Sequence, residues 1–293
     1  RAFAGFYRMY RADVAAFKND PVNMYEQQRQ AVVAMPYLDS IRRQYAITNL
    51  QIAVALSNNK DLSETDREQI TQLISQAIRE AKAASILDPN NVQNWVILAE
   101  IYRNISGVAK EADQWAVDSL VSAIQTDPTN PLLRIDLGQT FFDKAQYEDA
   151  ARFFNQAIEL KPDLAGGYFQ LGRALKEVGQ LENAKTLLEK SKTLVEEGSE
   201  EHTIIVKGIS ELDQAIAASA SGKKAASQSQ PKINDNGLLD TGKKAATGSA
   251  LLNLTKEGDV GLGSLTEQNT TQSQTDIVND TQSEPLRVPT ATP

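Results

Sequence analysis

Large and small apolar residues recur at helical spacing along the middle of the chain, and the pattern repeats after 34 residues. Residues 137–154 read Leu-Gly-x-x-Phe and then Ala-x-x-x-Phe, and residues 171–188 read Leu-Gly-x-x-Leu and then Ala-x-x-x-Leu. An earlier copy, 95–120, has the same order and is five residues longer between its halves. Apolar positions three and four residues apart share one face of a helix. The pattern therefore predicts three successive pairs of amphipathic helices.

In each predicted pair, the large residues of the first helix face small or apolar residues of the second. The large residues are Trp95, Leu98, Tyr102, Leu137, Phe141, Tyr168, Leu171 and Leu175. The small residues that let the backbones approach are Ala99, Ala116, Gly138, Ala150, Gly172 and Ala184. Burying one large side chain contributes roughly 1.5–3 kcal/mol. One pair cannot enclose its own apolar face, so we expect neighbouring pairs to stack.

Polar residues with capping chemistry stand between the predicted helices. Asn130 is placed to cap a helix with Pro131 at its first position, and Asp163 and either residue of 90–91 are placed to do the same. Residues 63–66, Ser-Glu-Thr-Asp, read as a capping box that opens a long helix. These signals agree with the helix boundaries that the apolar pattern predicts.

The chain divides by composition into five parts. Residues 1–36 are expected to form a degenerate helix pair and 37–90 a diverged repeat, while 91–198 hold the clear repeats. Residues 199–217 are expected to form a capping helix. Residues 218–293 contain no aromatic residue and are rich in polar residues, so they cannot bury enough surface to offset their ordering entropy. We expect this tail to be disordered.

Composition removes several kinds of chemistry. The chain has no cysteine and a single histidine, His202, which excludes disulfides and thiolate metal sites and argues against a Ser-His-Asp or multi-histidine arrangement. Pairs of acidic residues read as solvated helix faces, and His202 reads as a surface residue. The net charge of −8 argues against nucleic acid as the main partner. We expect no enzyme activity, no cofactor and no metal site.

The spacing of these residues resembles the tetratricopeptide repeat family over residues 92–196. The copy at 131–162 matches best and departs mainly at Arg134, where the family favours Trp. The last copy departs at Ser191 and at Glu196, as suits a terminal repeat. The resemblance implies an all-α, right-handed superhelical solenoid of helix-turn-helix repeats. It also implies a non-catalytic scaffold for protein–protein interaction.

In this family, ligands lie in a concave groove lined by first-helix positions that do not pack inward. Carried over to this sequence, these are Val96, Glu100, Arg103, Asn104, Ile135, Gln139, Phe142, Asp143, Phe169, Arg173, Lys176 and Glu177. The set has an apolar floor with basic residues at one end, which suits an amphipathic helix or an extended peptide with apolar anchors. The alternative is that the chain itself covers the floor, through its N-terminal helix or its tail.

Two further features leave alternatives open. The expansion at residues 107–111, followed by Trp115, is a second candidate surface, because function concentrates in such loops. Stacking of two copies through the apolar groove is another reading, so the oligomeric state stays open. Partner identity, compartment and the role of the tail are not readable from the sequence.

The N-terminus interleaves aromatic and basic residues over residues 1–11. Such mixtures are common where a helix leaves a bilayer, and they also occur in an ordinary amphipathic first helix. Residues 1–217 resemble, with less specific motifs, the carboxy-terminal repeat region of bacterial O-antigen ligases and polymerases, through residues 7–13, 56–59 and 77–84. This resemblance implies a regulatory or substrate-positioning region of a membrane glycan-assembly protein. The region would then be tethered upstream of Arg1, on the extracytoplasmic side of a bacterial membrane.

Overall fold

The computed structural model describes residues 2–59, 61–109 and 111–222, and every regular element in these ranges is helical. The helices are α1 (Ala2–Phe17), α2 (Pro21–Ala34), α3 (Asp39–Ser57), α4 (Glu64–Leu87), α5 (Val92–Asn104), α6 (Ala112–Thr126), α7 (Pro131–Asp143), α8 (Tyr147–Leu160), α9 (Ala165–Glu177), α10 (Leu181–Lys192) and α11 (Glu200–Gly222). Within the described ranges there is no strand, and no helix has the length and apolar character needed to cross a bilayer.

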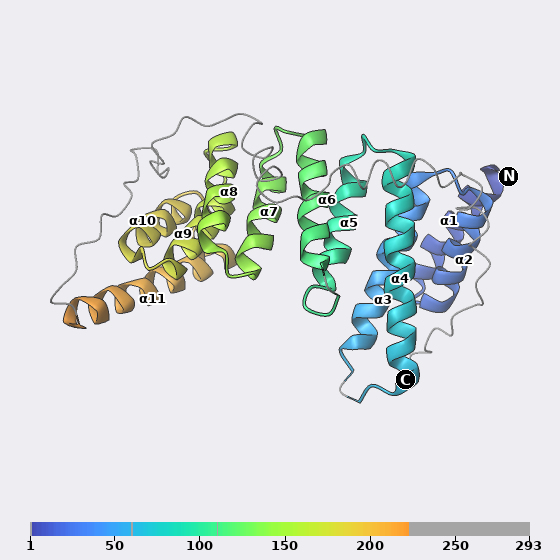
Figure 1. Cartoon of the computed structure of the whole chain (residues 1–293), viewed down its shortest axis with the longest axis horizontal. Coiled ribbons are helices and arrows are strands. Elements are labelled where there is room, and N and C mark those ends of the chain that lie inside the picture. Colours follow the sequence, from blue (N-terminus) through green and yellow to red (C-terminus); the bar gives the residue numbers. More distant parts are fainter. Residues whose placement is uncertain (1, 60, 110, 223–293) are drawn as a thin grey trace. The chain divides into compact units, whose positions relative to one another are not determined.

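The chain forms two compact units that divide inside α6, between Ser119 and Leu120. The first unit contains the hairpins α1–α2 and α3–α4, followed by α5 and the first part of α6 (Figure 1). The second contains the hairpins α7–α8 and α9–α10, followed by α11. The helix pairs predicted from the apolar pattern are therefore present in both units.

The first unit has two apolar clusters. One, between α2, α3 and α4, includes Tyr25 and Tyr45, whose hydroxyls are hydrogen-bonded at 2.9 Å. Burial raises the pKa of both phenols. The other cluster joins α3 and α4 to α5 and α6, with Leu98 and Tyr102 among its buried members. The diverged pair α3–α4 thus shares a core with the first clear repeat.

A buried ion pair crosses the α3–α4 hairpin. The Arg42 guanidinium lies 2.5 Å from the Glu80 carboxylate, and both side chains are 1% exposed. Arg42 also donates from Nε to the carbonyl of Pro36 at 2.6 Å. A buried charge needs a partner and further hydrogen bonds to offset its desolvation, and these contacts supply most of them.

In the second unit, the predicted small residues lie at the closest approaches between helices. A Cβ added to Gly138 would come within 2.6 Å of the Phe154 ring, and one added to Gly172 within 2.2 Å of Leu188. The rings of Phe141 and Phe153 stack at 5.2 Å. The predicted contact between a first-helix glycine and the second helix is therefore confirmed.

Most predicted caps are present. Asn130 accepts a hydrogen bond from the Leu132 amide, and Ser63 and Asp66 form the expected capping box. The prediction for Asp163 is wrong: residues 161–164 form a turn and α9 begins at Ala165, with no side-chain cap. The Leu164 amide donates to the Lys161 carbonyl in that turn, which carries the chain past Asp163 before the helix starts.

The last described helix, α11, packs on α10. Leu212 and Ile205 are buried, and Lys185 of α10 lies 2.7 Å from Asp213. The helix ends at Gly222 rather than near residue 217, because the alanine-rich stretch after Ile216 has high helix propensity. Residues 218–222, expected in the tail, are therefore helical. The expected disorder of 223–293 concerns residues outside the described ranges.

Candidate functional site

The twelve predicted groove positions lie on α5 in the first unit and on α7 and α9 in the second. None of the twelve side chains is buried. Half-exposed positions are Val96, Arg103, Ile135, Gln139, Phe142, Phe169, Arg173 and Lys176, and exposed ones are Glu100, Asn104, Asp143 and Glu177. The sequence places them outside the core because the large residues of the same helices, such as Leu137 and Leu171, fill the opposite face.

Five residues of α7 and α9 come together on the second unit, and we call them the α7–α9 face. They are Gln139, Phe142, Phe169, Gln170 and Arg173. The guanidinium carbon of Arg173 lies 4.6 Å from the centroid of the Phe142 ring and 6.0 Å from that of Phe169. The Gln170 amide donates to the Gln139 side-chain oxygen at 3.2 Å. The face therefore combines two aromatic rings, one cation and a pair of linked amides.

Local hydrogen bonds hold these side chains in place. Arg173 donates to the Gln170 oxygen at 2.7 Å, and Gln139 donates to Asp143 at 2.6 Å. The Phe142 ring meets Tyr147 edge-on at 5.1 Å. A cation over an aromatic ring is worth about 0.5–2 kcal/mol, depending on how far the pair is desolvated. These contacts hold Arg173 over the two rings.

The C-terminal end of α9 contacts α11. Lys176 forms an ion pair with Glu211 of α11 at 3.2 Å, so the predicted basic end of the face is partly neutralised. Glu177 stays exposed beside it. Glu211 could not be predicted as a neighbour because it lies on a separate helix, 35 residues further along the chain.

The predicted positions on α5 belong to the first unit. Asn104 donates to the carbonyl of Glu100 at 2.9 Å. At the start of the same helix, the Trp95 indole donates to the Pro89 carbonyl at 2.8 Å. Tyr168, at the equivalent place in the last repeat, donates to the Pro162 carbonyl at 3.1 Å. The two aromatic residues therefore have the same role in their repeats.

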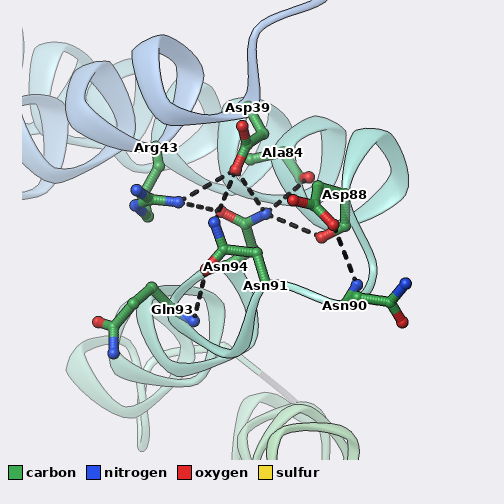
Figure 2. A network of polar contacts seen from close by, with 8 residues as sticks. All are labelled: Asp39, Arg43, Ala84, Asp88, Asn90, Asn91, Gln93 and Asn94. Atoms are coloured by element: carbon green, nitrogen blue, oxygen red, sulfur yellow. Dashed lines mark hydrogen bonds and ion pairs between the residues drawn. The ribbon is translucent and has the colours of Figure 1, made fainter. Parts of the chain in front are cut away.

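A polar network at the start of α5 joins three helices of the first unit (Figure 2). Buried Asn94 donates at 3.0 Å to the carbonyls of Ala84 and Asp88 and to the carboxylate of Asp39. Arg43 donates to the Asn94 oxygen at 2.6 Å and lies 3.2 Å from Asp39. The network links the start of α3, the end of α4 and the start of α5.

The electrostatics of this network favour an ionised Asp39. Burial alone would raise the pKa of Asp39, but hydrogen bonds, led by the one from Asn94, together with the charge of Arg43, hold it below its usual value. Asn91 adds a further hydrogen bond to the same carboxylate at 3.0 Å while capping α5 through the Gln93 amide. The carboxylate of Asp39 and the amides of Asn91 and Asn94 have partners within the protein, so we assign the network to stability rather than to binding.

The predicted second surface includes Trp115, and Lys82 lies over the rings of Trp115 and Tyr102. Lys82 lies 6.0 Å from the Tyr102 ring and 5.9 Å from the Trp115 ring. Burial lowers the pKa of Lys82 and raises the pKa of Tyr102 to about 12. Trp115 is 38% exposed, so part of its ring faces solvent.

Sequence models of two repeat families match the second unit. A model described as TPR repeat matches residues 138–179, and one described as tetratricopeptide repeat matches 165–194. These residues run from the middle of α7 to just past the end of α10 and carry the Gly138 and Gly172 contacts. Residues 138–194 therefore match the tetratricopeptide repeat.

Solved structures with the tetratricopeptide fold resemble this chain. The crystal structure of a MamA protein is 18% identical, covers 65% of this chain and 91% of its own, and gives a TM-score of 0.51. A tetratricopeptide-repeat protein from Thermus thermophilus, TTC0263, is 14% identical, covers 70% of this chain and 98% of its own, and gives a TM-score of 0.48. No curated protein matches the sequence. The relatives named here give no support to the resemblance to O-antigen ligases.

Sequence reasoning missed several residues of the site. Gln170 and Tyr147 lie beside predicted positions, and Gln170 follows Phe169 directly in the sequence. The 34-residue spacing makes Gln170 of α9 the counterpart of Asp136 of α7, each next to a predicted groove position, so the spacing could have suggested it. The described residues contain no group of three or more His, Cys, Asp or Glu side chains that could hold a metal ion.

Proposed function

We propose that the α7–α9 face binds an extended segment of a partner protein, and that this protein is a non-catalytic scaffold. Tetratricopeptide repeats support a role in protein–protein interaction. The single observation that carries the finer proposal is the position of Arg173 between the half-exposed rings of Phe142 and Phe169. Side chains of this kind, aromatic and arginine, dominate binding energy at protein interfaces.

The chemistry of the face indicates the features of the bound segment. The rings of Phe142 and Phe169 offer apolar contact for a large side chain, and the amides of Gln139 and Gln170 can hydrogen-bond to a peptide backbone. A guanidinium has five N–H donors, which leaves Arg173 donors beyond its bond to Gln170 for a carboxylate. We infer an extended peptide with one large apolar and one acidic side chain.

The same side chains support a role without catalysis. The twelve predicted groove positions include no hydroxyl, thiol or imidazole, and their carboxylates, Glu100, Asp143 and Glu177, lie exposed to solvent. Lys176 is held by Glu211, and Arg173 is held over the rings. These contacts suit recognition of a fixed shape, since ordering the side chains before binding lowers the entropy lost on binding.

A selection experiment tests the proposal without a known partner. Peptides from a random display library are selected on the full chain and then measured against variants in solution. We expect Phe142→Glu to weaken binding by about tenfold or more, because it places a charge where an apolar side chain is buried. Leu160→Glu, at an exposed apolar position on α8, is the matched control. Peptides that bind wild type and Phe142→Glu equally would refute the proposal.

A further inference from the structure

The first helix has an aromatic face that no described part of the protein covers. Its members are Phe3, Phe6, Tyr7, Tyr10 and Phe17, which are 85%, 57%, 50%, 64% and 93% exposed. At 3.6 residues per turn they share an arc of about 100° that runs for about 21 Å along the helix axis. We call these five residues the aromatic face of α1.

The opposite side of α1 explains why the rings point outward. Ala12 and Ala15 are buried, and a Cβ on Gly5 would come within 2.3 Å of the Met35 side chain. Arg8 donates to Gln27 of α2 at 3.1 Å. The small residues hold the backbone of α1 closely against its neighbours, so the packing fixes the aromatic face toward solvent.

An exposed face of this kind indicates a binding surface. Large exposed apolar patches mark sites of interaction. The five aromatic side chains on α1 are each at least half exposed and form such a patch, which calls for an occupant.

The charge around the face points to the nature of that occupant. Residues 1–18 contain four basic side chains and one acidic one, although the whole chain has a net charge of −8. Arg11 and Lys18 are exposed and lie beside the Tyr7 edge of the arc. Helices with aromatic residues on one face and Lys or Arg beside them lie in the interface of anionic membranes. We propose that the aromatic face of α1 docks on an anionic lipid surface.

A second copy of the chain fits the same face less well. A coiled coil of two copies of α1 would place Ile, Val or Leu at its seam, whereas this seam is Phe and Tyr. A lipid surface accepts both the aromatic rings and the basic groups beside them, since rings enter the headgroup region and the basic groups meet phosphates.

Vesicle co-sedimentation of the full chain tests this proposal. The probes are vesicles of phosphatidylcholine alone and of phosphatidylcholine mixed equally with phosphatidylglycerol. We expect binding to the mixed vesicles, weaker binding to the neutral ones, and a decrease on adding salt, because screening weakens the basic contacts. Failure to bind either vesicle would overturn the proposal.

Variants distinguish binding through the aromatic face from nonspecific hydrophobic adsorption. Phe6→Gln with Tyr10→Gln should lower partitioning onto the mixed vesicles by about tenfold or more. Leu160→Gln with Ile204→Gln, two exposed apolar positions on other helices, is the matched control and should bind as wild type does. Circular dichroism should show equal helicity for both doubles. Equal vesicle binding by the two double variants would refute docking on lipid. Self-association of the wild-type chain without lipid, if the Phe6 and Tyr10 substitutions abolish it, would also refute it.

Discussion

Gly138 of α7 lies so close to Phe154 of α8 that a Cβ on the glycine would come within 2.6 Å of the ring. The same Cβ would lie 3.2 Å from the Ala150 carbonyl oxygen, and the Phe154 side chain is fully buried. Glycine at this position lets the hairpin close without displacing the Phe154 ring or the backbone of α8, which explains the Leu-Gly spacing of this repeat.

Replacing this glycine should destabilise the second unit. Gly138→Ala gains up to about 1 kcal/mol of helix propensity but overpacks the contact, at a cost of about 1–3 kcal/mol. We expect a net loss of about 1–2 kcal/mol in the free energy of unfolding, measured by urea denaturation. Gly166→Ala is the control, because nothing lies within 4 Å of its Cβ position. Unchanged stability of Gly138→Ala would show that the contact is looser than described.

The buried ion pair should be costly to break and cheap to replace. Glu80→Ala leaves the Arg42 guanidinium buried without its carboxylate and should cost about 3–5 kcal/mol in unfolding free energy. The double variant Arg42→Met with Glu80→Leu removes both charges and should lose much less. A thermodynamic cycle built from Arg42→Met, Glu80→Leu and the double variant measures the coupling. If the double variant proves as unstable as Glu80→Ala, the buried charge is not the cause.

The polar network should make the unfolding free energy of the first unit depend on pH in acid. The pKa of Asp39 is lower in the folded state than in the unfolded chain, where it is about 3.9. The stabilisation that ionised Asp39 contributes is therefore complete above its pKa in the unfolded chain. It is lost as the pH falls through the lower pKa of the folded state. We expect Asp39→Asn to be less stable than wild type at neutral pH and the difference to shrink in acid. A constant difference in unfolding free energy across this pH range would contradict the assignment.

The repeat geometry could be predicted because its signal is local. The spacing from Gly138 to Ala150 to Phe154 encodes two helices and the distance between them, and Asn130 with Pro131 marks a helix start. The predicted departure at Ser191 also has a structural role, since its buried hydroxyl donates to the Ala165 carbonyl at 2.9 Å. Serine therefore satisfies a backbone group at the point where the repeat pattern weakens.

Contacts between distant residues could not be predicted in the same way. Asn94 reaches Asp39 across 55 residues, and Lys176 meets Glu211 on a helix whose position no spacing reveals. The predicted positions on α7 and α9 do meet, but the contact that orders them is the one between Arg173 and Phe142, which spacing alone does not give. Side-chain pairing between helices depends on rotamers and tilt, which the sequence pattern does not specify.

The central claim is that a polypeptide lies on the α7–α9 face, and photo-crosslinking tests it most directly. A photoreactive benzoylphenylalanine is placed at residue 142 in one version of the full chain and at residue 160 in another. Each version is irradiated with a peptide selected on the wild-type chain, and the products are mapped by mass spectrometry. We predict crosslinks to the peptide from residue 142 and none from residue 160. Crosslinks from residue 160 alone, or equally from both positions, would contradict the account.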